Sequence, residues 1–189
     1  MKNFIIVFIL FFSALAFESN AQDEQRTSEK YGQTLNLGVG VGYYGYLGHS
    51  LPVVTLNYEF DVAKNLTLAP FVGVYTNRNS YYWGSKDYPY RYYSYSERVI
   101  PLGVKGTYYF DQLLGLNSKW DIYAAGSLGF VLRSVSWENG YYGSRYEYSN
   151  VSPLYLDIHV GTEYHLSPKA GIFLDLSTGV STAGLAVHF

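Results

Sequence analysis

The chain has 189 residues, a length typical of one domain. Its formal net charge of −2 disfavours a nucleic-acid partner, since binding of nucleic acid requires a basic face. The absence of cysteine excludes disulfide scaffolds, thiolate metal sites and cysteine nucleophiles. The 22 tyrosines, 11 phenylalanines and 19 glycines indicate strands and turns rather than helices.

The N-terminal segment has the features of a secretory signal peptide. Lys2 gives it a positive start, residues 4–17 are almost continuously apolar, and residues 19–21 form a small-x-small site. We predict cleavage after Ala21, because the apolar stretch is too short to span a bilayer comfortably as an uncleaved anchor. Residues 22–32 are predicted to be a flexible leader, since they are mostly polar and lack periodicity.

From residue 33 onward, apolar residues alternate with polar or small ones, which is the period of strands with one apolar face. Eight segments are predicted as strands: 35–41, 54–60, 66–74, 100–110, 120–133, 154–165, 172–177 and 183–189. Short connections at 63–65, 111–119 and 167–169 alternate with those at 44–50, 79–96, 138–150 and a tight turn at 179–182. Short turns at one end and longer loops at the other are typical of an up-and-down transmembrane β-barrel.

The alternative is a secreted, lipocalin-like barrel whose apolar face points inward. The polar face here is rich in Gly, Ala, Ser and Tyr and carries only isolated charges, whereas a surface in water is far more charged. Aromatic residues of the apolar face gather beside the short turns and the C-terminus, as in an interfacial girdle: Tyr58, Phe60, Tyr108, Phe110, Trp120, Tyr164 and Phe189. These features favour an all-β, eight-stranded antiparallel transmembrane barrel over residues 33–189.

Three segments carry a resemblance to a known family. They are Asn20-Ala21-Gln22, residues 100–105 (IPLGVK) and residues 179–189 (GVSTAGLAVHF). With the strand pattern, they resemble small bacterial outer-membrane β-barrel proteins, in particular the OmpA- or OmpX-like barrels of the Bacteroidota. The resemblance implies the outer membrane of a Gram-negative bacterium, and a terminal Phe189 that helps the barrel-assembly machinery recognise the chain. We expect no periplasmic peptidoglycan-binding domain. The resemblance implies no ligand.

The charged residues of the polar face would share the barrel interior. They are Glu59, Lys105, Arg133, Asp157, His159, Glu163 and Asp175. Imidazole and carboxylate groups are suitable for a metal or acid–base site. No ligand-spacing motif accompanies them, however, and the interior of an eight-stranded barrel is filled by side chains. We therefore favour a network of ion pairs and hydrogen bonds, with no metal, no cofactor and no porin-like channel.

An outer-membrane enzyme is a second class of function. Lipid A deacylases and palmitoyltransferases resemble this architecture and need a histidine with a serine or an acid near the outer rim. Only His49, followed by Ser50, is expected at that end, whereas His159, His165 and His188 face the lumen. We predict that the protein is not an enzyme and keep lipid A modification as the alternative.

The remaining functional signal lies in the longer loops. Residues 81–95 contain seven tyrosines and Trp83, and residues 138–150 add four tyrosines. Candidate ligand-binding residues are Tyr81, Tyr82, Trp83, Tyr88, Tyr90, Arg91, Tyr92, Tyr93, Tyr141, Tyr142, Arg145 and Tyr146. Such rings are typical of binding surfaces for glycans or proteins. Equally, strands 3–6 could continue above the membrane as a tyrosine-laddered sheet.

The sequence therefore predicts an outer-membrane barrel with periplasmic termini and extracellular tyrosine-rich loops. Its role would be structural, or would be surface binding and adhesion through those loops. Expected partners are outer-membrane lipid and lipopolysaccharide, the barrel-assembly machinery, and an extracellular glycan or protein ligand. We expect a monomer that binds no nucleic acid.

Overall fold

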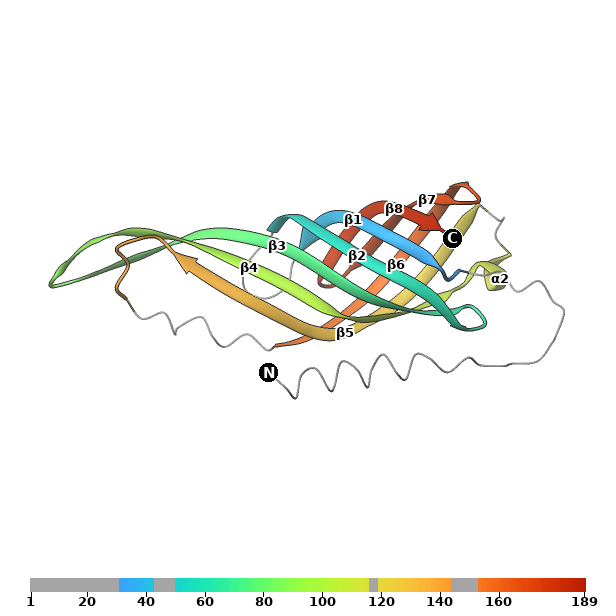
Figure 1. Cartoon of the computed structure of the whole chain (residues 1–189), viewed down its shortest axis with the longest axis horizontal. Coiled ribbons are helices and arrows are strands. Elements are labelled where there is room, and N and C mark those ends of the chain that lie inside the picture. The colour runs from blue at the N-terminus through green and yellow to red at the C-terminus, as the bar shows by residue number, and fades with distance from the viewer. Residues whose placement is uncertain (1–30, 43–49, 116–118, 144–152) are drawn as a thin grey trace.

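The computed structural model describes residues 31–42, 50–115, 119–143 and 153–189 (Figure 1). In these ranges, eight antiparallel strands follow one another in sequence order around a closed barrel. The strands are β1 (Thr34–Gly42), β2 (Ser50–Ala63), β3 (Leu66–Ser85), β4 (Tyr88–Tyr109), β5 (Trp120–Trp137), β6 (Leu154–Ser167), β7 (Ala170–Ser177) and β8 (Val180–His188). A one-turn helix, α2 (Asp111–Leu114), follows β4. No helix among the described residues is long and apolar enough to cross a bilayer.

The barrel closes where β1 pairs with β8. Thr34 lies opposite His188, and Leu37 lies opposite Leu185, so residues of the same face meet across the seam. The predicted up-and-down, eight-stranded antiparallel fold is confirmed by this order of pairing. The turn between β2 and β3 contains Asn65 with a φ of 58°, a left-handed conformation that asparagine tolerates better than most residues.

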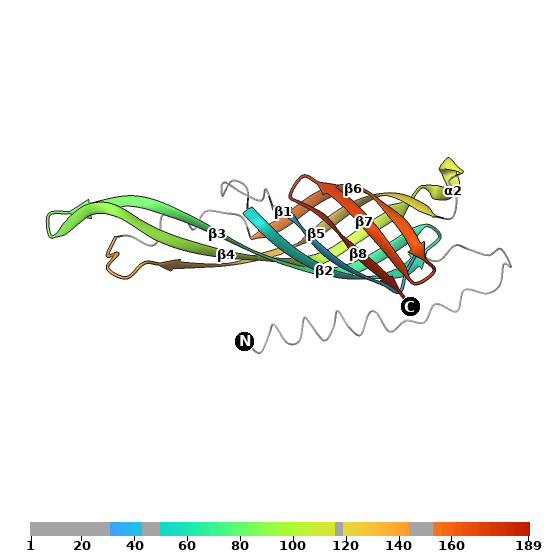
Figure 2. The same ribbon diagram turned by 90° about the horizontal axis from the view of Figure 1, so that it is seen from above.

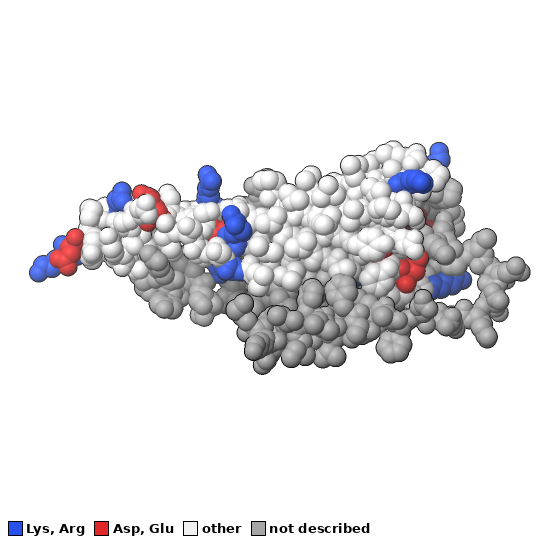
Figure 3. Space-filling view, in the orientation of Figure 1, with Lys and Arg blue, Asp and Glu red and all other residues white. Residues whose placement is uncertain are grey.

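The barrel has an apolar exterior and a polar interior. Along β6, Leu156 and Ile158 are 61% and 69% exposed on the outside, whereas Asp157 and His159, which alternate with them, are buried. Figure 3 shows the exterior, where charged side chains gather toward the two ends and leave an uncharged band over the barrel wall. This arrangement reverses that of a lipocalin-like barrel. Hydrocarbon rather than water matches such an exterior, so the fold is that of a transmembrane barrel.

Aromatic side chains line the exterior at the end of the short turns. Tyr108 packs edge-on against Phe110, and Trp120 packs against Tyr164, with ring centroids 4.9 Å and 4.8 Å apart. Phe189, at the end of the chain, is 74% exposed. These rings occupy the positions expected of an interfacial girdle, where amphipathic rings lie between lipid and water.

The predicted connection at residues 79–96 is wrong. Strand β3 continues to Ser85 and β4 begins at Tyr88, so only Lys86 and Asp87 join them. Strand β5 continues beside β4 as far as Trp137. The hairpin therefore projects far beyond the other strands as a ribbon (Figures 1 and 2). We call residues 76–98 and 134–143 the extension. Its long ladder confirms, for strands β3, β4 and β5, the alternative of a tyrosine-rich sheet continuing above the barrel. β6, by contrast, begins only at Leu154.

Candidate functional site

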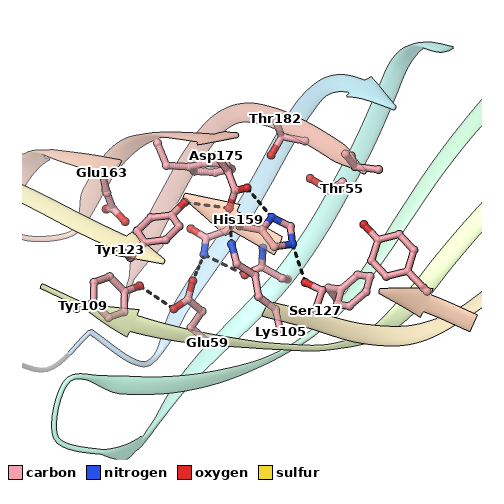
Figure 4. Close-up of a pocket in the computed structure, with 16 residues that line it drawn as sticks. Thr55, Glu59, Lys105, Tyr109, Tyr123, Ser127, His159, Glu163, Asp175 and Thr182 are labelled. Carbon is pink, nitrogen blue, oxygen red and sulfur yellow. Dashed lines mark hydrogen bonds and ion pairs between the residues drawn. The ribbon is translucent and has the colours of Figure 1, made fainter. Parts of the chain in front are cut away.

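The lumen contains a charged cluster centred on Asp175 of β7 (Figure 4). Lys105 of β4 forms an ion pair with Asp175 Oδ2, and the hydroxyl of Tyr123 donates to the same oxygen at 3.1 Å. Asp175 Oδ1 lies 2.7 Å from His159 Nδ1, and Ser127 Oγ lies 2.8 Å from His159 Nε2. The cluster thus satisfies a buried ammonium and a buried carboxylate within the barrel, as burial of charge requires.

Glycine makes room for one ring of this cluster. Tyr123 lies across Gly161, its cross-strand neighbour on β6. A Cβ at Gly161 would lie 2.3 Å from Cζ of the Tyr123 ring. The absence of a side chain there therefore allows the phenol to lie flat along the wall and reach Asp175.

Glu59 of β2 is held by neutral hydrogen-bond donors. Asn36 donates to Oε1 at 2.9 Å, while Thr67 and Tyr109 each donate to Oε2 at 2.8 Å. Tyr31, from the end of the predicted leader, stacks on Tyr109 with ring centroids 4.1 Å apart. The residues before β1 therefore help to enclose the carboxylate at the short-turn end of the lumen.

Asp157 of β6 organises the turn between β7 and β8. Its carboxylate accepts five hydrogen bonds, two of them from backbone amides. The donors are Tyr155 OH, Ser177 Oγ, Thr178 Oγ1, Gly179 N and Val180 N. A carboxylate bound in this way is a structural element of the turn, because its lone pairs are occupied by the protein itself.

The lumen is nearly filled. The groups around Asp175 and Glu59 enclose a cavity of about 50 Å³, which has room for a few water molecules at most. Toward the extension, Val53, Tyr75, Val99 and Val180 form an apolar layer across the described part of the barrel. A small cavity with an apolar layer on one side indicates a packed interior rather than an open pore.

Two of the predicted lumen residues have their charged partners outside the cluster around Asp175. Arg133 forms an ion pair with Glu97, whose side chain is completely buried at the base of the extension. Glu97 was not identified from the sequence because it lies between the predicted connection, which ends at residue 96, and the predicted strand, which begins at residue 100. Glu163 lies near the short turns, where its Oε1 is 2.7 Å from His188 Nε2.

The inner face of the extension is a packed aromatic cluster. Trp137 stacks on Tyr141 with centroids 4.0 Å apart, and Tyr141 contacts Trp83 and Tyr93 at 5.2 Å and 5.4 Å. The Arg91 guanidinium lies 4.5 Å from the centroid of the Tyr93 ring. A hydrogen bond with Tyr93 raises the pKa of Arg91, so its positive charge is secure. These rings hold three strands together beyond the barrel.

The outer face of the extension is exposed. Tyr82 lies directly opposite Tyr92, and their rings and that of Tyr90 are 55%, 68% and 66% exposed. Between these tyrosines and the barrel lies an open groove. It is lined by Arg78, Asn79, Ser80, Ser94, Tyr95, Ser96, Ser136, Trp137 and Glu138. Among the described candidate tyrosines, Tyr81, Tyr93 and Tyr141 therefore pack on the inner face. Tyr82, Tyr90 and Tyr92 contact one another but remain exposed on the outer face.

Some sequence predictions fall outside the described residues. These are the signal peptide, residues 22–30 of the predicted leader, His49, Arg145 and Tyr146. The side chain of Ser50 is also outside the description, although its backbone begins β2. The lipid A-modifying alternative, which depended on His49 and Ser50, therefore stays a hypothesis.

The sequence matches no protein-family profile and no curated protein. Solved structures of similar fold include the following three. Neisserial surface protein A is 18% identical, with 82% of this chain and 95% of that chain covered and a TM-score of 0.49. Ail, the attachment invasion locus protein of Yersinia pestis, in complex with the heparin analogue sucrose octasulfate, is 10% identical, with coverages of 82% and 96% and a TM-score of 0.42. A de novo designed transmembrane barrel is 15% identical, with coverages of 84% and 98% and a TM-score of 0.44. Similarity at these values carries no information about ligand or activity.

Proposed function

We propose that this protein is a non-enzymatic outer-membrane barrel that binds an extracellular glycan through the outer face of its extension. The observation that carries the proposal is the set of exposed rings of Tyr82, Tyr90 and Tyr92 beside a polar groove. The predicted signal peptide and the apolar barrel wall together support the outer membrane, because exported barrels of this kind fold there.

The chemistry of the outer face favours a carbohydrate over an apolar surface. The faces of tyrosine rings stack on sugar rings, and their hydroxyl groups remain available as hydrogen-bond partners. The groove supplies several serine hydroxyls, an amide from Asn79, a cation from Arg78 and a carboxylate from Glu138. Sugars present many hydroxyl groups and little continuous apolar surface. A sugar therefore matches this polar lining better than a protein partner would, since the centre of a protein interface is more apolar.

The inner face of the extension supports the same conclusion, because it fixes the outer rings in place. Packed aromatics such as Tyr93 and Trp137 hold the ribbon as a regular sheet. Rings carried by a rigid sheet lose little conformational entropy when a ligand binds. A ribbon that projects beyond the membrane would also carry them away from the lipid headgroups.

The test is binding of the full protein, folded into lipid nanodiscs, to an array of neutral, acidic and sulfated glycans and to purified lipopolysaccharide. We expect binding to at least one glycan class, and loss of it when Tyr82, Tyr90 and Tyr92 are changed together to serine. The matched control changes the same three residues to phenylalanine, which keeps the rings and should preserve most of the binding. Heat-dependent gel mobility checks that both variants fold.

Two results would contradict the proposal. The first is that the folded wild-type protein binds no glycan on the array, which would leave a purely structural envelope role. The second is glycan binding that persists unchanged in the serine variant, which would remove the outer face of the extension from the interaction.

A further inference from the structure

A second constellation lies at the opposite end of the barrel, beside the short turns. Glu163 and His165 of β6 and His188 of β8 place one ligand atom each within 4.8 Å of one another. Strand β7 separates β6 from β8 in the sheet, so the carboxylate of Glu163 must cross it. It does so over Gly171, where a Cβ would lie only 2.0 Å from Glu163 Oε1. The sequence therefore leaves space for this carboxylate to reach the histidine of β8.

The hydrogen bonds of His188 determine which ring nitrogen faces Glu163. The hydroxyl of Thr34 donates its single hydrogen to the carbonyl oxygen of Tyr31 at 2.9 Å. Thr34 Oγ1 must then accept a hydrogen bond from His188 Nδ1, which lies 2.9 Å away. In a neutral imidazole with its proton on Nδ1, Nε2 carries a lone pair, and here it lies 2.7 Å from Glu163 Oε1. A lone pair and a carboxylate oxygen repel each other unless a proton or a cation lies near both.

His165 is oriented in a similar way. Its Nε2 lies 2.8 Å from Asp121 Oδ2, and an ionised carboxylate can only accept, so Nε2 carries the proton. The ring then presents Nδ1 to the same oxygen of Glu163, at 3.9 Å. An imidazole whose second nitrogen donates to a carboxylate is the arrangement that orients metal-binding histidines and raises their basicity.

We infer that Glu163, His165 and His188 form a binding site for a divalent transition-metal ion, with Zn²⁺ as the best fit. Two imidazole nitrogens and a carboxylate oxygen are ligands that zinc accepts. A tetrahedral zinc site has ligand atoms about 3.3 Å apart. The distances of 2.7 Å and 3.9 Å from Glu163 Oε1 bracket that value, and the three ligand atoms, which lie within 4.8 Å of one another, would draw together around the ion. The side chains of His165 and His188 are 23% and 17% exposed, so water can reach the site and occupy a fourth position.

The site also has a structural consequence. A bound ion would join β6 to β8, and Thr34 of β1 and Asp121 of β5 would hold the two histidines from behind. Strands β1 and β8 form the seam at which the barrel closes. Zinc would therefore fix β8 to β6 at the short-turn end, and it would fix His188 in the position from which it hydrogen-bonds to Thr34 across the seam. The site lies away from the extension, so this inference is independent of the glycan proposal.

The competing explanation is a metal-free ion pair. A doubly protonated His188 would donate through both nitrogens, to Thr34 and to Glu163, and would need no cation. The two explanations differ in whether the folded protein takes up one metal ion at these residues.

The experiment is zinc titration of the untagged, folded protein in detergent by calorimetry after treatment with a chelator, together with visible spectra of the Co²⁺ form. We expect one ion per chain and the intense spectrum of four-coordinate Co²⁺. Glu163→Gln and His188→Gln should each weaken Zn²⁺ binding at least a hundredfold, and Asp121→Asn should weaken it about 10- to 100-fold. Gly171→Ala keeps every ligand but displaces the Glu163 carboxylate, and it should also weaken Zn²⁺ binding.

The matched control is His49→Gln, which removes an imidazole from another part of the chain and should leave the affinity for Zn²⁺ unchanged. Heat-dependent gel mobility establishes that each variant is folded. The inference is overturned if the folded wild-type protein takes up no stoichiometric zinc. It is equally overturned if binding survives both Glu163→Gln and His188→Gln, or if His49→Gln weakens it as much as they do.

Discussion

The ion pair between Lys105 and Asp175 offers the sharpest test of the lumen energetics. Both side chains are almost completely enclosed, with 9% and 5% of their surfaces exposed. Removing one partner of a buried ion pair costs about 3–5 kcal/mol, because the other charge is left in a medium of low dielectric constant. Lys105→Met should fall near the lower end of that range, since Asp175 keeps Tyr123 and His159 as hydrogen-bond partners.

Asp175→Leu should cost more than Lys105→Met. The Lys105 ammonium then loses its carboxylate partner and keeps the Tyr123 ring, whose centroid lies 4.9 Å away. The substitution also removes the partner of His159 Nδ1. The double variant, Lys105→Met with Asp175→Leu, should then be more stable than Asp175→Leu alone by about 2 kcal/mol, because it no longer buries an unpaired charge.

The assay is equilibrium unfolding of the four proteins in urea, in detergent micelles or lipid vesicles. The free energy of unfolding of each is compared in a double-mutant cycle. The reasoning is refuted if Lys105→Met costs less than about 1 kcal/mol and the double variant is no more stable than Asp175→Leu. In that case the ammonium and the carboxylate would be solvated by lumen water rather than by each other.

Two further predictions concern separate parts of the molecule. Asp157→Ala should destabilise the protein by about 3 kcal/mol, because it leaves several buried donors unsatisfied. Amide hydrogen exchange at Gly179 and Val180 should accelerate more than elsewhere, since both amides donate to Asp157. An equal acceleration at all amides would show that Asp157 does not organise the turn. Tyr93→Ser should open the extension without unfolding the barrel, so that limited proteolysis cuts within residues 76–98 while the heat-dependent gel shift remains. The exposed-face variant Tyr92→Ser is the matched control and should resist proteolysis as the wild type does.

The alternation of apolar and polar residues was sufficient to predict the barrel. It works where one face meets lipid and the other meets a polar lumen, as in Leu156, Asp157 and Ile158. It fails in the extension, because Ser80, Tyr81, Tyr82 and Trp83 offer no contrast between successive residues. There both faces are aromatic, and only the pairing of β3 with β4 reveals the strands.

The sequence pattern also could not predict that the residues of the proposed metal site lie close together. Alternation assigns Glu163, His165 and His188 to the lumen face but gives no information about their height in the barrel. Their approach depends on the register of three consecutive strands, in which His165 lies opposite Gly171 and Ala170 lies opposite Val187. The pairing of Arg133 with Glu97 was missed because the strand was predicted to begin at residue 100, whereas β4 begins at Tyr88 and includes Glu97.

A barrel with this apolar exterior and a predicted signal peptide is expected to be embedded in the outer membrane. The most direct test compares the gel mobility of the outer-membrane fraction with and without boiling, in cells that express the protein. We predict that the chain is found in that fraction and that its mobility changes on heating, because a folded barrel resists detergent until it is heated. A chain recovered in soluble form from the periplasm or the medium, with no heat-dependent shift, would contradict the claim.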